Sequence, residues 1–335
     1  MRIFMTGATG YLGLRLASDI VRAGHNLTAL VRDRDRAAPL ESLGARCVLG
    51  DVTDFDRAGV DLKDFDACVH AAALVRTRVK DRREFDRVNV AGVANVARRA
   101  LDARISRFLY TSTFMALGFT PDGRVLDETA EHAPDHFHND YERTKYLGLK
   151  EFEEWLKRGL AGIALMPGVI YGPGAFTSGN LTAQAIADLV LARMPGVIGD
   201  GTRVLTYSFI EDVIEGHMLA LSRGRIGDRY VLGGETVSLE EFARRAALVA
   251  GVKAPTRHIP YWVAKAFALA EEEKCRITGR EPRLTREVVE IYKHHWAYSC
   301  RKAQAELGYK VTPLDDGLKA TVAWIKMAIR EGKIK

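Results

Sequence analysis

Short apolar runs alternate with amphipathic stretches along the first half of the chain. The runs are short and end abruptly, which predicts buried strands, and the stretches between them carry apolar residues at helical spacing. The predicted strands cover Ile3–Met5, His25–Val31, Ala45–Leu49, Ala67–His70 and Arg107–Thr111, and the predicted helices cover Tyr11–Val21, Asp81–Ala103 and Asp140–Arg158. This regular alternation predicts an α/β fold, a doubly wound parallel sheet with helices on both faces and right-handed crossovers.

The first predicted strand runs into a turn that contains Gly7, Gly10 and Gly13. A helix follows directly, so its first backbone N–H groups and its dipole favour an anion, and a glycine lacks the Cβ that would hold a pyrophosphate away. The spacing is one residue wider than the usual dinucleotide-binding pattern. The alternative is a tight turn that needs glycines only for packing.

A charged turn follows the second predicted strand. In dinucleotide-binding folds this strand end meets the adenosine ribose, where an acidic residue accepts from the 2′-hydroxyl and an arginine accommodates a 2′-phosphate. Val31 stands where an acidic residue would favour NAD, and Arg32 favours NADP, although Asp33 is adjacent. The alternative is a solvated run of charges.

Tyr141 and Lys145 lie four residues apart and therefore share one face of the predicted helix. A free tyrosine has a pKa near 10. A nearby lysine cation, together with a nicotinamide cation when one is bound, is expected to lower it, which makes the phenol a usable proton donor to a carbonyl that receives a hydride. A hydroxyl from Thr113 or Ser112 could hold that carbonyl. Asn89 is polar within an apolar helix stripe and needs a buried partner.

Composition limits the class of protein. The chain has 335 residues, 47% hydrophobic and 27% charged, which excludes disordered and coiled-coil classes. The net charge of +6 gathers in Arg76–Arg87 and Arg98–Arg107, without the interleaved aromatics typical of nucleic-acid binding. The four scattered cysteines indicate neither disulfides nor zinc. A strand at residue 2 leaves no room for a signal peptide, and no apolar run is long enough for a membrane span, so we expect a cytoplasmic protein.

Taken together, the motifs resemble the extended short-chain dehydrogenase/reductase superfamily, also called the NAD-dependent epimerase/dehydratase superfamily. The nearest likeness is to its dihydroflavonol reductase-like and hydroxysteroid dehydrogenase-like branch. The matching segments, in family order, are Thr6–Gly13, Asp51–Asp54, His70–Ala73, Asn89–Gly92, Tyr110–Thr113, Tyr141 with Lys145, Met166–Gly174, Ser208–Val213, Tyr230–Gly234 and Lys302–Tyr309. The resemblance implies a Rossmann fold with a smaller, mostly helical substrate domain.

The resemblance also implies residue roles. Tyr141 would be the general acid/base, Lys145 would hold the ribose and tune the phenol, and Thr113, with Ser112 as the fallback, would orient the carbonyl. Asn89 would be linked to the lysine through water. The implied cofactor-binding residues are Gly7, Gly10, Tyr11, Leu12, Gly13, Arg32, Asp51, Val52, Ala71, Ala72, Ala73, Tyr141, Lys145, Pro167 and Val169.

We expect residues 1–173 and 205–234 to form the nucleotide domain, 174–204 and 235–313 the substrate domain, and 314–335 a C-terminal helix. The apolar segment Ile259–Ala270 would line a hydrophobic pocket, touch a membrane surface, or pack as a core helix. The histidines at 132, 136 and 138 have no common ligand spacing, so we expect no metal and place their loop over the active site.

The expected activity is an NAD(P)-dependent, NADP-preferring oxidoreductase that passes a hydride between the nicotinamide and a ketone or secondary alcohol of a small apolar substrate. One alternative is an epimerase or dehydratase of a sugar or sugar-nucleotide. Against it, Tyr207 stands where such enzymes generally carry an arginine for the diphosphate, although Arg203 could substitute. Another alternative is a non-catalytic cofactor-sensing protein. The helices 81–103 and 140–158 are expected to pair in a homodimer.

Overall fold

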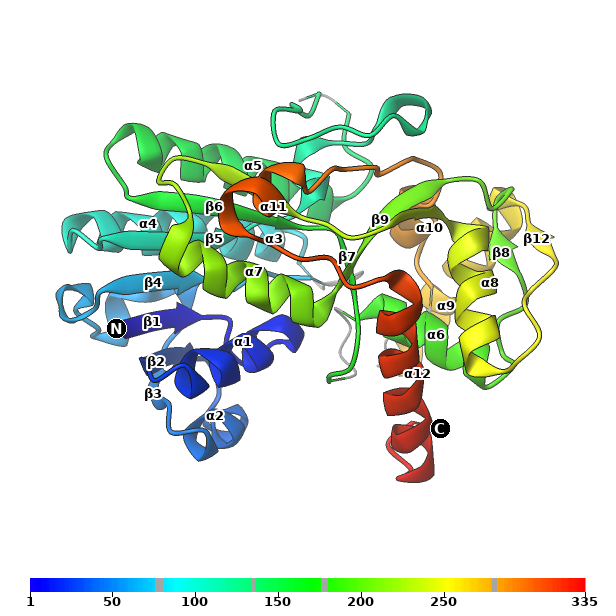
Figure 1. Cartoon of the computed structure of the whole chain (residues 1–335), viewed down its shortest axis with the longest axis horizontal. Helices are drawn as coiled ribbons and strands as arrows, with labels where there is room; N and C mark the ends of the chain where they lie inside the picture. Colours follow the sequence, from blue (N-terminus) through cyan, green and yellow to red (C-terminus); the bar gives the residue numbers. More distant parts are fainter. Residues whose placement is uncertain (76–80, 134–135, 176–179, 279–281, 283, 335) are drawn as a thin grey trace.

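A seven-stranded parallel sheet organises one half of the molecule, on the left in Figure 1. The computed structural model describes residues 1–75, 81–133, 136–175, 180–278, 282 and 284–334. The strand order is β10-β6-β5-β4-β1-β2-β3, and every pairing is parallel, which confirms the predicted fold class. The strands are β1 (Arg2–Thr6), β2 (Asn26–Val31), β3 (Arg46–Leu49), β4 (Ala67–His70), β5 (Arg107–Thr111), β6 (Gly162–Pro167) and β10 (Arg229–Leu232).

Helices cover both faces of this sheet (Figure 1). One face carries α1 (Tyr11–Arg22), α2 (Ala38–Ser42) and α7 (Ile210–Arg223), and the other carries α3 (Arg83–Asp86), α4 (Gly92–Asp102) and α5 (Asp140–Lys157). Short 3-10 helices lie in the connections, at Arg34–Arg36, Val52–Ala58, Leu62–Asp64, Phe114–Leu117 and Pro121–Gly123.

The long helix predicted over 81–103 is not uniform. A π-helical segment, Arg87–Ala91, separates α3 from α4 and contains Asn89. Such bulges add one residue to a helical turn and displace the side chain at that point. The first residues of the basic segment Arg76–Arg87, 76–80, lie outside the described residues.

A mostly helical second half gathers beyond the carboxyl ends of the strands, on the right in Figure 1. α12 packs against α8 and α6, and α10 packs against α9. The elements are α6 (Leu181–Val190), β8 (Val197–Ile198), α8 (Leu239–Ala250), β12 (His258–Ile259), α9 (Tyr261–Thr278), α10 (Arg286–Ile291) and α12 (Leu314–Arg330). β7 (Val169–Tyr171), β9 (Val204–Phe209) and β11 (Thr236–Ser238) form a small sheet that joins the halves.

One segment differs from the expected division of the chain. α11 (Arg301–Leu307) falls within the range 235–313 expected in the substrate domain, yet it packs against α7 and the edge strand β10 of the large sheet. Buried Ala303 and Leu307 provide the apolar face that makes this contact favourable.

The connections place a crevice beside β1. The chain moves outward from β1 through β2 to β3 and then returns to β4 on the other side of β1, so the loops diverge between β1 and β4. Ligands of open α/β sheets bind in this crevice, at the carboxyl ends of the strands. Ile3, Phe4 and Met5 of β1 are fully buried, which holds the turn after Thr6 on a rigid base. No helix among the described residues is both long and apolar enough to cross a bilayer.

Candidate functional site

A continuous cavity of about 1210 Å³ begins at the crevice and extends into the helical half. It contains all of the cofactor-binding residues that the sequence predicts and both candidate hydroxyl groups, Ser112 and Thr113. The predicted residues in its wall are Gly7, Gly10, Tyr11, Leu12, Gly13, Arg32, Asp51, Val52, Ala71, Ala72, Ala73, Tyr141, Lys145, Pro167 and Val169. Asn89 is absent from this wall.

The glycines of the first turn serve two purposes. Gly7 has a φ of +77°, and a Cβ there would lie 2.5 Å from the carbonyl carbon of Ala71. A Cβ on Gly13 would lie 2.0 Å from the carbonyl oxygen of Gly7. These two glycines are therefore required by packing, as the alternative explanation supposed.

Gly10 differs, because the nearest atom to a Cβ there is the Gly7 carbonyl oxygen at 3.3 Å. Gly10 is the N-cap of α1, has no side-chain cap, and faces the cavity. The first N–H groups of a helix lack intrahelical partners, so this end presents donors to the cavity. The arrangement fits the diphosphate of a dinucleotide.

Two arginines stand at the far end of the crevice. Arg32 and Arg36 both line the cavity, and Arg36 donates from Nη2 to the Thr9 carbonyl at 3.4 Å. Arg32 is exposed, with its Nη1 4.0 Å from Oδ2 of Asp51. Asp33 instead caps the following 3-10 helix, accepting from the N–H of Asp35 at 2.9 Å. Sequence reasoning missed Arg36, although its spacing of four from Arg32 was a usable signal.

Tyr141 lies at the start of α5, half-buried, beside the hydroxyl of Thr113. Burial raises the pKa of Tyr141 to about 12, and the hydrogen bond with Thr113 offsets only part of this. Lys145 alone therefore does not lower the tyrosine pKa as expected, and the lowering by a bound nicotinamide cation stays a prediction. The reason is that Lys145 points its ammonium elsewhere, and the phenol keeps its proton at neutral pH.

Lys145 lies one helical turn after Tyr141 and is 2% exposed. Its Nζ donates to the Thr111 carbonyl at 2.9 Å and to the Tyr110 hydroxyl at 3.4 Å. Burial lowers the pKa of Lys145 to about 7, because no carboxylate among the described residues compensates for the lost hydration. An additional acceptor beside Nζ, such as the hydroxyls of a ribose, would restore the charged form.

Asn89 has the buried partners that its position required. Its Oδ1 accepts from the Leu74 N–H at 2.7 Å, and its Nδ2 donates to the Leu74 carbonyl at 3.2 Å and to Thr144 Oγ1 at 3.0 Å. These bonds tie the π-helical segment to α5 and to the chain after β4. Its direct contacts therefore suit a positioning role, and the water link to Lys145 stays a prediction.

The loop ahead of Tyr141 holds α5 by a buried carboxylate. Glu142 is fully buried and accepts from His132 Nε2 at 2.7 Å, His138 Nδ1 at 3.1 Å and the His138 N–H at 2.9 Å. Burial alone would raise the pKa of Glu142, but the bonds from both histidines bring it below the ordinary value. His136 is exposed. Among the described residues, no group of three possible ligands is arranged to hold a metal ion.

The helical half supplies a largely apolar wall. Tyr207 stacks on Phe242 with ring centroids 4.0 Å apart, and both line the cavity. Arg203, considered as a substitute anion ligand, instead contacts His295 Nε2 at 3.0 Å and is not in the wall.

The segment Ile259–Ala270 divides its side chains between the cavity and solvent. Val263 and Ala264 of α9 line the cavity, and Phe267 lines its rim but is exposed. Trp262 and Leu269 are exposed and lie outside the wall, Trp262 at 74%. The expectation of a pocket wall thus agrees with the structure, and the alternative of a fully packed core helix does not.

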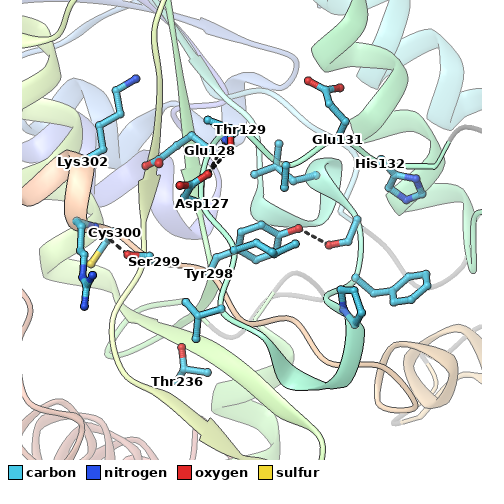
Figure 2. Close-up of a pocket in the computed structure, with 18 of the residues that line it drawn as sticks. Asp127, Glu128, Thr129, Glu131, His132, Thr236, Tyr298, Ser299, Cys300 and Lys302 are labelled. Atoms are coloured by element: carbon cyan, nitrogen blue, oxygen red, sulfur yellow. Dashed lines mark hydrogen bonds between the residues drawn. The ribbon is translucent and has the colours of Figure 1, made fainter.

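A second cavity, of about 960 Å³, lies between residues 117–133 and 298–304 (Figure 2). Its polar groups are largely used within the protein. Tyr298 donates to the Gly118 carbonyl at 2.5 Å, Asp127 accepts from Thr129, and Glu128 accepts from the Val231 N–H at 2.8 Å. This second cavity contains neither Tyr141 nor the glycine turn, so the chemistry of the first is not available there.

Comparison with known proteins agrees with this geometry. A family model described as the NAD dependent epimerase/dehydratase family matches residues 3–233. The putative dihydroflavonol 4-reductase of Synechocystis sp. is 29% identical over 327 residues, covering 96% of this chain and 94% of its own. The 4-hydroxy-2-methyl-3-oxo-4-farnesyl-3,4-dihydroquinoline-1-oxide ketoreductase of Stigmatella aurantiaca is 33% identical over 316 residues, covering 92% of each chain.

Solved structures share the whole architecture. The crystal structure of gox2253 matches with a TM-score of 0.82 and 33% identity, covering 100% of this chain and 99% of that one. The UDP-glucuronic acid 4-epimerase from Bacillus cereus, solved in complex with NAD, matches with a TM-score of 0.76 over 98% of this chain and 99% of its own. At 20% identity, that second likeness concerns the fold alone.

Proposed function

Since this chain belongs to the NAD-dependent epimerase/dehydratase family and is an NAD(P)-dependent enzyme of the extended short-chain dehydrogenase/reductase type, we propose that it reduces a ketone on an apolar substrate with NADPH. One observation carries this proposal. The cavity that starts at the glycine turn reaches Tyr141, Thr113 and Lys145 and then continues into an apolar pocket. A hydride donor and an apolar carbonyl compound can therefore meet beside the tyrosine.

The residues at this meeting point provide proton transfer and orientation. Tyr141, whose pKa is about 12, holds its proton and donates it to the carbonyl oxygen as that oxygen becomes an alkoxide. The Thr113 hydroxyl directs the carbonyl toward the phenol, and Lys145, which also lines the cavity, would hold the ribose of the bound cofactor. A bound nicotinamide cofactor supplies the hydride.

The preference for NADP rests on Arg32 and Arg36. Both guanidinium groups lie where the second strand ends. The Asp33 carboxylate caps the next 3-10 helix and does not face a ribose. This end of the cavity therefore favours the 2′-phosphate of NADP over the 2′-hydroxyl of NAD. The Stigmatella relative, whose name describes a farnesyl-bearing ketone, supports an apolar ketone as the substrate class.

The test is a panel of apolar ketones and secondary alcohols, with NADPH and with NADH, followed by the absorbance of the reduced cofactor. We expect stoichiometric NADPH oxidation with at least one ketone, and a Tyr141→Phe variant slower by about 10² to 10⁴-fold. Absence of cofactor oxidation across the panel would contradict the proposal.

Epimerisation or dehydration of a sugar or sugar-nucleotide is a second candidate. Arg193 and Arg257 line the helical part of the cavity and could bind a diphosphate, although Tyr207 replaces the usual arginine. Such an enzyme would convert UDP-glucuronic acid or UDP-glucose without net consumption of added NADPH. Product formation of that kind, detected by chromatography, would favour this candidate over ketone reduction.

A non-catalytic cofactor sensor is the third candidate. It needs the cofactor cleft but not the phenol, so its biological effect would survive Tyr141→Phe. Loss of the effect in that variant, with NADPH affinity unchanged, would exclude the sensor.

We place the protein in the cytoplasm as a homodimer. All four cysteines are free, which suits a reducing compartment. The proposed interface uses α4 and α5, whose exposed side chains include charged groups such as Arg98 and Glu154. A polar interface of this kind weakens with salt. Sedimentation equilibrium at micromolar protein should show a dimer, and only monomer at low salt would contradict it.

A further inference from the structure

One carboxyl group in the wall of the substrate cavity forms no hydrogen bond or ion pair with the described part of the chain. Glu287 lies on α10, and Leu284, Glu287, Val288 and Ile291 all line the cavity. Leu284 precedes the helix, which begins at Arg286, and the helix residues Glu287, Val288 and Ile291 share its cavity-facing side. Glu287 is therefore a single carboxyl group within an otherwise apolar stripe.

The other charged side chains of α10 are paired. Arg286 forms hydrogen bonds from Nε and Nη2 to Glu272, and Glu290 lies 2.6 Å from Lys265 Nζ and 3.2 Å from Lys293 Nζ. Among the described side chains, Glu287 has neither a hydrogen bond nor an ion pair. The two cations whose charges lower its pKa, Arg82 and Arg286, are hydrogen-bonded to Asp140 and to Glu272.

The helix that carries Glu287 is held in place. Val289 packs with Ala264 and Ala268 of α9, Thr285 caps the first turn, and Trp296 Nε1 donates to the Ile291 carbonyl at 2.9 Å. A rotation of α10 that turned Glu287 out of the cavity wall would break these contacts. The carboxyl group is thus kept against the cavity.

The site also lies close to the reactive end of the cavity. The charge of Asp140, the residue before Tyr141, acts on Glu287. Burial, and then Asp140, raise the pKa of Glu287 to about 7, so the group both donates and accepts hydrogen bonds at neutral pH. Glu287 is half-buried, so a ligand that covers it completely has to supply a hydrogen-bond partner, and a hydroxyl group does so.

We propose that Glu287 forms a substrate-binding subsite for a hydroxyl group. This inference rests on the proposed reductase function and refines its substrate class to an apolar ketone that carries a hydroxyl away from its carbonyl. Glu287 is a specificity residue in this proposal and takes no part in proton transfer to the carbonyl.

The test compares 4-phenyl-2-butanone with its 2-, 3- and 4-hydroxyphenyl derivatives, which move one hydroxyl around the same ketone. Wild-type enzyme should show a KM about tenfold lower for at least one hydroxyphenyl isomer than for the parent. Glu287→Leu should remove this preference, and Glu287→Gln, which keeps the hydrogen-bonding capacity, should retain most of it. Glu290→Gln, on the same helix but outside the cavity wall, is the matched control and should behave as wild type.

Folding is checked by thermal unfolding. Because Glu287→Leu replaces an unpartnered carboxyl in an apolar wall, its Tm should equal or exceed that of wild type. A preference that survives in Glu287→Leu, or the absence of any preference in wild type, would overturn the subsite.

A failure of the reductase proposal is separable from a failure of the subsite. If none of the four ketones is reduced, the reductase function fails for this class, and calorimetry then measures the same compounds binding to the NADP-loaded protein. A tenfold weaker Kd for a hydroxyphenyl isomer in Glu287→Leu, without change for the parent, would support the subsite. Equal Kd values in the two proteins would overturn it.

Discussion

At the scale of single residues, the first turn leaves room for a side chain at Gly10 but not at Gly7 or Gly13. A Cβ on Gly10 meets only the Gly7 carbonyl oxygen at 3.3 Å, whereas one on Gly13 would lie 2.0 Å from that oxygen. The pattern of three glycines therefore combines two requirements, the packing of the turn and the access of a ligand.

Alanine substitutions should separate these requirements. Gly10→Ala should leave the Tm within a degree or two of wild type but weaken NADPH binding at least tenfold, because the methyl group occupies the diphosphate position. Gly13→Ala should cost about 1 to 3 kcal/mol of stability, because the turn must move. Thermal unfolding and fluorescence titration of NADPH measure both effects. Wild-type affinity in Gly10→Ala would show that no diphosphate rests there.

The arginines at the other end of the cleft make a second prediction. Replacing Arg32 and Arg36 with alanine should raise the KM for NADPH about 10 to 100-fold and leave that for NADH nearly unchanged, because only NADPH loses charge-assisted hydrogen bonds. Arg34→Ala, in the same turn but outside the cavity wall, is the control. An equal effect on both cofactors would contradict a 2′-phosphate site.

At the scale of elements, the N-terminus of α5 depends on Glu142. Glu142→Gln removes a buried charge that accepts from two histidines and should cost roughly 2 to 3 kcal/mol. It should also lower kcat, since Tyr141 is the adjacent residue. Urea unfolding and steady-state kinetics measure the two effects. Glu154→Gln, near the exposed end of the same helix, should change neither, and an unchanged stability in Glu142→Gln would show that this contact does not hold the helix.

The regular elements were largely predictable, because periodic apolar residues report burial directly. The predicted strands Ala67–His70 and Arg107–Thr111 match the structure residue for residue. The π-helical break at Arg87–Ala91 was not predictable, since it depends on Asn89 meeting the backbone of Leu74, a contact set by tertiary packing. The spacing of apolar residues within a helix does not indicate that a residue such as Asn89 has a backbone partner elsewhere in the fold.

Much of the site was predictable for a different reason. The glycines of the first turn, and Tyr141 with Lys145, have a fixed spacing along the chain. Their pattern can therefore be recognised in the sequence alone. Glu287, by contrast, reaches the cavity only through the fold. The misjudged tyrosine pKa has the same origin, because the orientation of Lys145 depends on the Thr111 carbonyl of a neighbouring strand.

At the scale of the whole molecule, two buried histidines couple stability to pH. Burial lowers the pKa of His70 to about 3 and that of His217 to about 4, and both stay neutral in the folded protein. Unfolded histidines bind protons below about pH 6.5. The unfolded chain thus takes up more protons on acidification, and folding stability present above this pH is lost as the pH falls.

The free energy of unfolding should therefore decrease between pH 6.5 and pH 5, by up to about 1.4 kcal/mol per pH unit for each histidine. Urea unfolding at several pH values measures this slope. His217→Gln should reduce it, while His136→Gln, at an exposed position, should not. A pH-independent stability over this range would contradict the prediction.

The position of α12 has a consequence for the synthesis of the protein. α6 and α8 belong to the helical half, and α12 (Leu314–Arg330) packs over both of them. In the sequence α12 follows every strand of the large sheet. A ribosome that stops before Leu314 releases a product with every strand of the large sheet. In that product α6 and α8 expose the apolar surface that α12 normally covers. Such a product would attract chaperones and proteases despite an intact dinucleotide cleft.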